Sequence, residues 1–495
     1  MPRDWLAPPD YCRLSERGIT GQLSNPMNID LVDTRGQFWK LSVRTILSRI
    51  LNFSRPWLLA VGWLAAGAVR ADDWPQWLGP QRDAVWRETG ILKEFPPGGL
   101  PVQWRTAIGA GYSGPAVANG RVYVTDRVLA SGAQNPTNQI QRSTVRGVER
   151  VLCLNATDGQ IVWQHEYECA YTVSYPAGPR TTPVVSGGKV YTLGAEGNLL
   201  CLDAATGKVG WERNFKQDYH MSAPTWGFAA NPLVDGNQLI CLVGGPSNVV
   251  VACDKETGRE LWHARSANEP GYSSPIIITA GGQRQLIVWS PEELAALNPA
   301  TGAVYWSEPF PIRNGLTVAT PYYQDGRLLV TAFYNGALML RLNPHQPTAT
   351  VLWRGQREDE KNTDGLHGIM CTPLIVDGYV YGVCSYGQLR CLKAETGERV
   401  WETLAATTTD GKPARRANAF LVKNGDRFFL NNEAGDLIIA QLDPQGYHEI
   451  SRTHLLDPTN TAAGRKVVWS HPAYADRCIF VRNDREILCV SLAKR

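Results

Sequence analysis

Short runs of β-branched and aromatic residues, separated by turns that contain glycine, fill the chain from about residue 100 onward. In the clearest stretch, the run TPLIV at 372–376 turns through Asp377 and Gly378 into YVYGVC. A Tyr-Gly turn then leads to QLRCL, and a Thr-Gly turn leads to ERVW, which ends at Trp401. Runs of this length broken by Asp-Gly or Thr-Gly are hairpin signals. The stretch therefore predicts four consecutive antiparallel strands.

One pattern recurs along the chain: apolar, Cys, Leu, Asp or Asn, two variable residues, Thr or Asp, Gly, three variable residues and Trp. It reads VLCLNATDGQIVW at 151–163, LLCLDAATGKVGW at 199–211 and LRCLKAETGERVW at 389–401. Successive tryptophans are 44 to 51 residues apart, and eight units can be counted, the last at ILCVSL from Ile487. Eight such units of four strands predict an all-β fold, an eight-bladed β-propeller of four-stranded antiparallel blades.

The last unit contains only three strands and no terminal tryptophan. An unpaired edge would invite aggregation, so the ring needs a fourth strand from elsewhere. The segment PVQWRTAIG, with Trp104 in the repeat position, precedes the first unit. We therefore expect residues 102–107 to complete the eighth blade, and the propeller to occupy residues 101–495.

The repeated tryptophans and cysteines are interpreted as structural. A large ring at one place in each blade most simply packs against the next blade. The expected blade-docking residues are Trp104, Trp163, Trp211, Trp262, Trp306, Trp353 and Trp401. The cysteines at one repeat position, Cys153, Cys201, Cys391 and Cys489, are expected to be free thiols that fill the sheets as small apolar residues.

The N-terminal part predicts export. Basic residues precede a short apolar run, PWLLAVGWLAAGAV at 56–69, which is followed by Arg70 and Ala71. This run is shorter than the roughly 20 residues that span a bilayer as a helix, and the pattern favours a signal peptide at 43–71 over a buried core helix. We expect cleavage after Ala71, a lead-in segment at 72–100, and a periplasmic or extracellular protein without a membrane span. Residues 1–42 are expected to be a non-structural extension, or to lie upstream of the true translation start.

Composition narrows the function classes. The net charge of +3 and the absence of Lys/Arg runs give no reason to expect nucleic-acid binding. The eleven cysteines include no vicinal pair and no C-x-x-C, which excludes the usual haem-attachment and thioredoxin-type patterns. No cysteine directly follows the apolar run, so no lipid-attachment site is expected. We expect a monomer.

The repeat resembles that of the pyrroloquinoline-quinone-like (PQQ-like) propeller family, which includes quinoprotein dehydrogenases and BamB-like proteins of outer-membrane assembly. The chain is also similar to exported bacterial propellers of this family that begin with W-P-Q-W and end like HPAYADRCIFVRNDREILCVSL. The resemblance covers residues 100–492 and implies the eight-bladed fold. One scaffold carries unrelated activities, so the resemblance leaves the function open.

The dehydrogenase branch implies a quinone held between a tryptophan and a vicinal disulfide, with Ca²⁺ bound by Glu, Asn and Asp. The chain has no Cys-Cys pair and no compact acidic cluster, and calcium requires six to eight oxygen ligands. We therefore expect no cofactor and no metal, with PQQ and Ca²⁺ retained for the enzymatic alternative. The BamB-like branch implies protein contacts, although the lipidated cysteine of that branch is missing here.

The long loops should share one face of the propeller, because they join the second to the third strand or one blade to the next. Binding usually resides in long loops on a rigid scaffold. The candidate binding residues in or beside them are Arg180, Asp218, Tyr219, His220, Trp226, Lys361, Asn362, His367, Asn431, Glu433, Arg482 and Asn483. Their types suit a small polar ligand or a protein, although polar loop residues often only form turns. A metal site from His220 and His367 lacks a spacing signature.

The preferred hypothesis is an exported scaffold without catalysis, which binds a protein or a small polar ligand on the long-loop face. The first alternative is a PQQ/Ca-dependent quinoprotein dehydrogenase that oxidises an alcohol or a sugar. The second is a glycan-binding propeller.

Overall fold

The computed structural model describes residues 28–32, 38–42, 72–408 and 410–494. The chain divides into two units, Met1–Arg70 and Ala71–Arg495. In the first unit, β1 (Asn28–Val32) pairs antiparallel with β2 (Phe38–Ser42). The signal peptide expected at 43–71 lies outside the described residues. Before residue 72, only the two strands β1 and β2 are described. The signal peptide at 43–71 and the extension at 1–42 therefore stay predictions.

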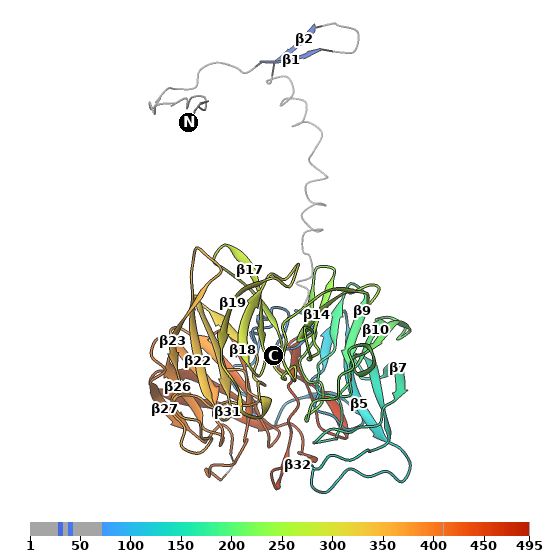
Figure 1. The fold of residues 1–495 in the computed structure, drawn as a ribbon, viewed down its shortest axis with the longest axis vertical. Helices are drawn as coiled ribbons and strands as arrows, with labels where there is room; N and C mark the ends of the chain where they lie inside the picture. The colour runs from blue at the N-terminus through green and yellow to red at the C-terminus, as the bar shows by residue number, and fades with distance from the viewer. Residues whose placement is uncertain (1–27, 33–37, 43–71, 409, 495) are drawn as a thin grey trace, which may run out of the picture. The chain divides into compact units, whose positions relative to one another are not determined.

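The second unit contains eight four-stranded antiparallel sheets, which are the blades of the propeller (Figure 1). Blades 1 to 4 comprise β4 (Ala116–Ala118), β5 (Arg121–Leu129), β6 (Gly147–Asn155), β7 (Ile161–Glu168); β8 (Val184–Ser186), β9 (Lys189–Leu193), β10 (Asn198–Asp203), β11 (Val209–Asn214); β12 (Leu233–Asp235), β13 (Gln238–Leu242), β14 (Val250–Asp254), β15 (Glu260–Ala264); β16 (Ile276–Ala280), β17 (Gln283–Trp289), β18 (Glu293–Leu297) and β19 (Val304–Pro309). The blades follow one another around the unit, so that β5 and β7 lie on one side in Figure 1 and β22 and β26 on the other.

Blades 5 to 8 continue the same order. They comprise β20 (Tyr322–Gln324), β21 (Arg327–Ala332), β22 (Gly336–Leu342), β23 (Ala349–Arg354); β24 (Leu374–Val376), β25 (Tyr379–Val383), β26 (Leu389–Lys393), β27 (Arg399–Thr403); β28 (Ala419–Asn424), β29 (Arg427–Asn432), β30 (Asp436–Asp443), β31 (Gly446–His454); β34 (Ala473–Ala475), β35 (Cys478–Arg482), β36 (Glu486–Ser491) and β3 (Val102–Ala107). A small hairpin of β32 (Asn460–Ala462) and β33 (Arg465–Val467) precedes blade 8. The eight-bladed all-β fold predicted from the repeat is confirmed.

Blade 8 is closed by the N-terminal strand, as predicted. Strand β3 pairs antiparallel with β36, and Trp104 lies opposite Cys489 in the register. The side chain of Arg105 pairs with Glu486 at 3.0 Å across the same two strands. Closure leaves the last blade with four strands like the others, so the ring has no three-stranded gap.

The repeated Asp-x-x-Thr-Gly segment is a turn between the third and fourth strands of a blade. In blade 2, Asp203 Oδ1 accepts hydrogen bonds from the Thr206 backbone N at 2.9 Å and from Thr206 Oγ1 at 2.8 Å. Gly207 has a φ of +72°, which favours glycine. A Cβ at Gly207 would lie 2.5 Å from the indole of Trp163. The turn therefore forms the seat on which the tryptophan of the preceding blade rests.

All seven repeat tryptophans donate an indole hydrogen bond to a residue outside their own strand. The indole N–H of Trp163 donates to Ala204 O at 3.0 Å, in the turn of blade 2. The indoles of the remaining six donate to the following acceptors: Trp104 to Ala156 O, Trp211 to Lys255 O, Trp262 to Gln238 Oε1, Trp306 to Gln285 Oε1, Trp353 to Ala394 O and Trp401 to Asp443 O. Five of the seven bonds thus join one blade to the turn of the next.

The lead-in segment, residues 72–100, runs along the inner strands of several blades. The Trp74 backbone N donates to Val117 O at 2.8 Å in blade 1, and the Trp86 backbone N donates to Lys423 O at 2.8 Å in blade 7. Both indoles are buried at 1% exposure and pack against Tyr474 of blade 8. Arg82 Nη1 donates to Pro232 O at 2.7 Å, just before blade 3. The lead-in therefore ties together blades that are distant around the ring.

The ten cysteines of the described residues are free, and nine of them are buried. Burial raises the pKa of the Cys153, Cys201 and Cys391 thiols to about 11, so these groups stay neutral inside the sheets. The helices described within residues 72–494 are the single turns α3 (Phe215–Asp218) and η1 (Arg313–Gly315). No helix in the described ranges is long and apolar enough to cross a membrane.

Candidate functional site

The propeller contains a cavity of about 200 Å³, here named the axial pocket. Its lining from blades 1 to 4 comprises Tyr112, Tyr175, Arg180, Trp226, Ala229, Asn231, Tyr272 and Ser274. Its lining from blades 5 to 8 comprises Leu316, Val318, Ile369, Met370, Arg416, Phe420, Trp469 and His471, and Trp77 is added by the lead-in. Every blade therefore contributes to one pocket.

The lining residues share a position in the repeat. Apart from Trp77, and from Phe420 in β28, they lie in the segment directly before the first strand of a blade. The first strand is the innermost one in the ring, so the segments before it converge on the axis. These segments belong to the face that carries the blade-to-blade connections, which we name the loop face. The opposite face, with the Asp-x-x-Thr-Gly turns, is the turn face.

Trp77 closes part of the pocket wall from the lead-in. Its indole N–H donates to Thr320 Oγ1 at 2.9 Å. Its ring packs on the His471 ring with a centroid separation of 4.8 Å, and the Phe420 ring also packs on His471, at 5.0 Å. An N-terminal segment thus supplies a side chain to a pocket otherwise built by the blades.

His471 is a neutral member of this wall. It is buried at 4% exposure, and its Nδ1 lies 2.7 Å from Pro472 O. Burial lowers the pKa of the imidazole to about 4, because the charged form would lose its hydration. At neutral pH the ring therefore acts as a flat, uncharged surface between two aromatic neighbours.

Two further aromatic pairs belong to the lining of the pocket. The rings of Tyr175 and Trp469 are 6.0 Å apart, and Trp226 meets Tyr272 edge to face at 5.5 Å. Such arrangements stabilise aromatic pairs beyond the area that they bury. The result is a pocket with flat apolar walls and few polar groups, which is the usual composition of a small-ligand site.

Arg180 organises the connection between blades 1 and 2. Its Nε donates to Trp226 O at 2.8 Å, and its Nη2 donates to Ser174 O at 2.8 Å and Tyr175 O at 2.7 Å. Its Nη1 donates to Gly178 O. A guanidinium bound to four backbone carbonyls fixes the loop path, so Arg180 positions the wall of the pocket.

Arg416 is the second guanidinium in the pocket. It ends the connection between blades 6 and 7, and its Nη1 donates to the Tyr175 hydroxyl at 2.9 Å. The beginning of this connection is anchored to blade 7, because Arg452 Nη2 donates to Ala405 O at 2.6 Å and Asn432 Nδ2 donates to Ala406 O at 3.3 Å.

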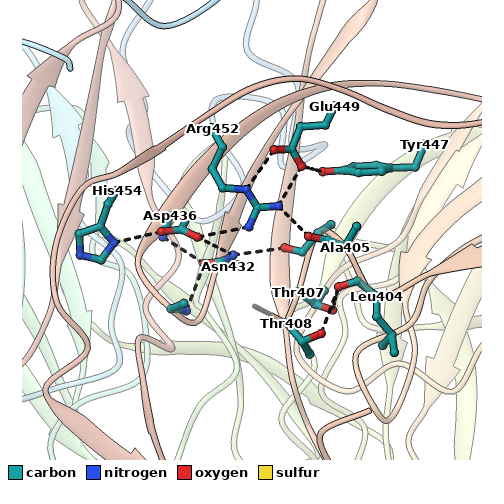
Figure 2. A network of polar contacts seen from close by, with 12 residues as sticks. Leu404, Ala405, Thr407, Thr408, Asn432, Asp436, Tyr447, Glu449, Arg452 and His454 are labelled. Carbon is teal, nitrogen blue, oxygen red and sulfur yellow. Dashed lines mark hydrogen bonds and ion pairs between the residues drawn. The ribbon is translucent and has the colours of Figure 1, made fainter. Parts of the chain in front are cut away.

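The anchor belongs to a polar network on blade 7, which Figure 2 shows. Arg452 bridges Asp436, at 3.3 Å, and Glu449, at 2.8 Å. His454 lies between Asp436 Oδ1 at 3.0 Å and Asp457 Oδ1 at 3.1 Å. Partial burial alone would lower the pKa of His454, but the bonds to the two carboxylates outweigh it and raise that pKa. The network connects the exposed His454, through Asp436 and Arg452, to the Ala405 carbonyl of the loop.

The structure places two of the candidate binding residues, Arg180 and Trp226, in the lining of the axial pocket. Glu433 is outside the lining but contacts it, because its Oε2 accepts from the indole N–H of Trp469 at 2.9 Å. The same oxygen pairs with Arg465 at 3.0 Å. A role of these residues in binding stays a prediction.

The candidates of the 212–225 and 354–369 loops lie away from the pocket lining. Asp218 pairs with Arg213 at 2.8 Å, and the Tyr219 hydroxyl donates to Glu260 at 2.7 Å. His220, Lys361 and Asn362 are exposed. His367 is fully buried between Asp364 and Phe333 O, and burial lowers its pKa.

The remaining candidates of blades 7 and 8 are buried and bonded to other residues of the propeller. Asn431 Oδ1 accepts from the Tyr474 hydroxyl at 2.7 Å. Arg482 donates to Thr125 O and Gly109 O, both at 2.7 Å, which joins blade 8 to blade 1. Asn483 Nδ2 donates to Asp457 O at 3.0 Å. The structure brings these three residues to the blade 7–8–1 region, outside the axial pocket.

Several pocket residues were not among the candidates, notably Trp77, Tyr112, Arg416, Trp469 and His471. Four of them share a position that the repeat could have indicated, since they stand two to four residues before the first strand of a blade. Trp77 has no such signal, because the lead-in lies outside the repeat.

The pocket lining does not fit a calcium-bound quinone. Calcium requires six to eight oxygen ligands with carboxylates among them. Among the described residues no Asp or Glu lines the axial pocket, and no group of three or more His, Cys, Asp or Glu side chains could hold a metal ion. The charged groups of this lining are two guanidinium groups, which favour an anion.

The fold and the pocket define the class: an eight-bladed β-propeller with an axial pocket on its loop face. The chain belongs to the family described as outer membrane protein assembly factor BamB, whose model matches residues 147–338 and 246–494, more than half of the chain. This confirms the predicted resemblance.

A curated relative, BamB of Yersinia pestis, is 26% identical over 211 residues, or 41% of this chain. The alignment spans half the length of that relative. A europium-containing methanol dehydrogenase is similar in structure, with a TM-score of 0.56 and 13% identity, over 83% of this chain and 89% of that one. BamB from Moraxella catarrhalis has a TM-score of 0.48 and 14% identity, over 74% and 99%. At such identities the dehydrogenase likeness shows the fold alone.

Proposed function

We propose that the protein is an exported propeller that binds a partner on its loop face and does no chemistry on it. The observation that carries the proposal is the convergence of all eight blades on one pocket at that face. A rigid ring that presents loops around a central hollow is a general arrangement for binding. Among the described residues the pocket lining contains aromatic side chains and two guanidinium groups, and it contains no carboxylate that would hold a catalytic calcium.

The family supports a protein as the partner. The relative from Yersinia pestis is named for a role in outer membrane protein assembly, and the family carries the same description. Because the alignment covers half of that relative, its partners are not transferred to this chain one by one. We propose only the general function for this chain, which is binding of another polypeptide outside the cytoplasm.

The quinoprotein dehydrogenase is the second candidate, and the structural likeness to the methanol dehydrogenase favours it. The test is to mix the purified protein with PQQ and Ca²⁺, and to follow quinone absorbance and the reduction of a dye with alcohols or sugars. We expect no saturable, redox-active complex. A stoichiometric complex that reduces the dye would overturn the non-catalytic proposal.

The partner-binding face is tested by photo-crosslinking in the producing cell. A crosslinking amino acid is placed at the exposed loop-face positions Ile140, Lys361 and Lys412, and at the exposed turn-face positions Lys208 and Glu256 as matched controls. We expect the same discrete protein adduct from the loop face and none from the turn face. Equal adducts from both faces would contradict the proposal.

A further inference from the structure

The two guanidinium groups of the axial pocket differ in what they bind. Arg180 donates hydrogen bonds to four backbone carbonyls. Arg416 donates only through Nη1, to the Tyr175 hydroxyl, while its Nε is buried without a hydrogen-bond partner. Its Nη2 makes no hydrogen bond to any described residue. Arg416 is therefore the group with donors left for a ligand.

Arg416 also has no counter-charge, in contrast to Arg415 and Arg465. Arg415 pairs with Glu360 at 3.1 Å, and Arg465 pairs with Glu433. No carboxylate of residues 72–408 or 410–494 forms an ion pair with Arg416. Arg416 is half-buried in the pocket lining, and a carboxylate matches the planar fork of a guanidinium. The missing charge is thus one that a ligand can supply.

The walls beside Arg416 indicate the rest of the ligand. Trp77, Trp226 and Trp469 present flat apolar surfaces to the same hollow. Its volume of about 200 Å³ is below the roughly 300–1,000 Å³ of pockets for drug-sized ligands. The space therefore suits one aromatic ring with a short tail, and not a fused polycyclic cofactor with several carboxylates.

We infer that the axial pocket binds one aromatic ring that carries one carboxylate, with the carboxylate on Arg416 and the ring among the tryptophans. This deepens the proposed function and rests on it. Two sources share this chemistry: a small arylalkanoic acid, and the free C-terminus of a polypeptide that ends in phenylalanine or tryptophan. Both place a single anion at one end of a flat apolar group.

The test is calorimetric titration of the purified protein with three probes. The probes are 3-phenylpropanoate, the peptide Gly-Gly-Phe with a free carboxylate, and the same peptide with an amidated C-terminus. We expect saturable binding of at least one of the two carboxylates and none of the amide. Binding of the peptide alone assigns the site to polypeptide ends, and binding of phenylpropanoate alone assigns it to small acids.

The matched variants are Arg416→Gln and Arg415→Gln, which remove the same charge from adjacent positions. Loss of a charged hydrogen-bonding partner should weaken carboxylate binding about 10- to 100-fold in Arg416→Gln. Arg415→Gln should bind as the unchanged protein does, since Arg415 pairs with Glu360 outside the lining. Arg416→Lys, which keeps the charge and loses the fork, should fall between them. Circular dichroism verifies that each variant is folded.

Three results would overturn the inference: no saturable binding of either carboxylate, equal binding of the amide, or unchanged affinity in folded Arg416→Gln. None of these depends on the crosslinking result. Loop-face adducts without carboxylate binding would leave the proposed function standing and remove only the ligand assignment.

Discussion

Arg416 Nη1 donates a hydrogen bond of 2.9 Å to the hydroxyl of Tyr175, and the two residues come from connections that enter blades 7 and 2. Both have left-handed backbone, with φ of +63° at Arg416 and +53° at Tyr175. Such conformations cost of order 1 kcal/mol or more outside glycine, and they persist where the surroundings dictate them. The bond therefore joins two residues that the surrounding structure holds in unfavourable backbone conformations.

Replacing Tyr175 by phenylalanine should weaken the pocket without unfolding the ring. Loss of one hydrogen bond should lower the free energy of unfolding by about 1 kcal/mol, and Arg416 should hold a carboxylate less well because its position is less fixed. Urea denaturation and titration with the carboxylate probes measure the two effects. Tyr305→Phe is the control, since its hydroxyl bonds to no described residue. An unchanged Tyr175→Phe protein would show that the bond positions nothing.

Two glycines separate backbone strain from blade docking. Gly207 and Gly188 have φ of +72° and +76°, but only Gly207 faces an indole, that of Trp163, while Gly188 has nothing within 4 Å. Gly188→Ala should cost about 1 kcal/mol. Gly207→Ala should cost a further 1–3 kcal/mol or so, because the added carbon overpacks the contact. Chemical denaturation of both variants measures the difference, and equal losses would mean that the turn does not seat the tryptophan.

Acid should destabilise the pocket through His471. Its pKa is about 4 in the folded protein, against about 6.5 when exposed, so the unfolded chain binds the proton first. Stability is then full above pH 6.5 and is lost as the pH falls toward 4, by about 3 kcal/mol in total. The free energy of unfolding at pH 7.5, 5.5 and 4, compared with that of His471→Gln, isolates this contribution. A difference between the two proteins that stays constant with pH would contradict it.

The opposite dependence is expected at His454. Its pKa is raised by Asp436 and Asp457, so its contribution is complete below pH 6.5 and is lost as the pH rises through the raised value. The side chain is 51% exposed, and solvent screening should hold the effect below about 1 kcal/mol. Melting temperatures of His454→Gln and the unchanged protein at pH 5.5 and 8.5 test the sign. A larger difference at pH 8.5 would be the wrong direction.

The fold was readable from the sequence because each blade repeats its own turn chemistry. The Asp203–Gly207 turn and Trp163 are local signals, and their spacing counts the blades. Even the long-range closure by β3 followed from a tryptophan in the repeat position. The lead-in was readable only as a segment, since no repeat pattern shows that Trp74 and Trp86 pack on Tyr474.

The site was readable only in part. The candidate binding residues were polar residues of the long loops. Polarity does not distinguish a side chain that lines the pocket from one that stabilises a loop. His367 and Arg482 are buried in bonds to the chain itself, whereas Arg416 differs from them only in what surrounds its guanidinium. That difference arises from contacts between connections hundreds of residues apart, and no local pattern encodes them.

The closure of blade 8 also has a kinetic consequence. Arg105 of β3 meets Glu486 of β36, 381 residues later in the chain, so the first strand of the propeller to be synthesised is among the last to find its partner. Contacts at such separation give a high contact order and slow folding. Until the C-terminal residues emerge from the ribosome, β3 lacks its partner strand β36. A chain that ends before β36 would leave the backbone groups of β3 free to pair with other protein molecules.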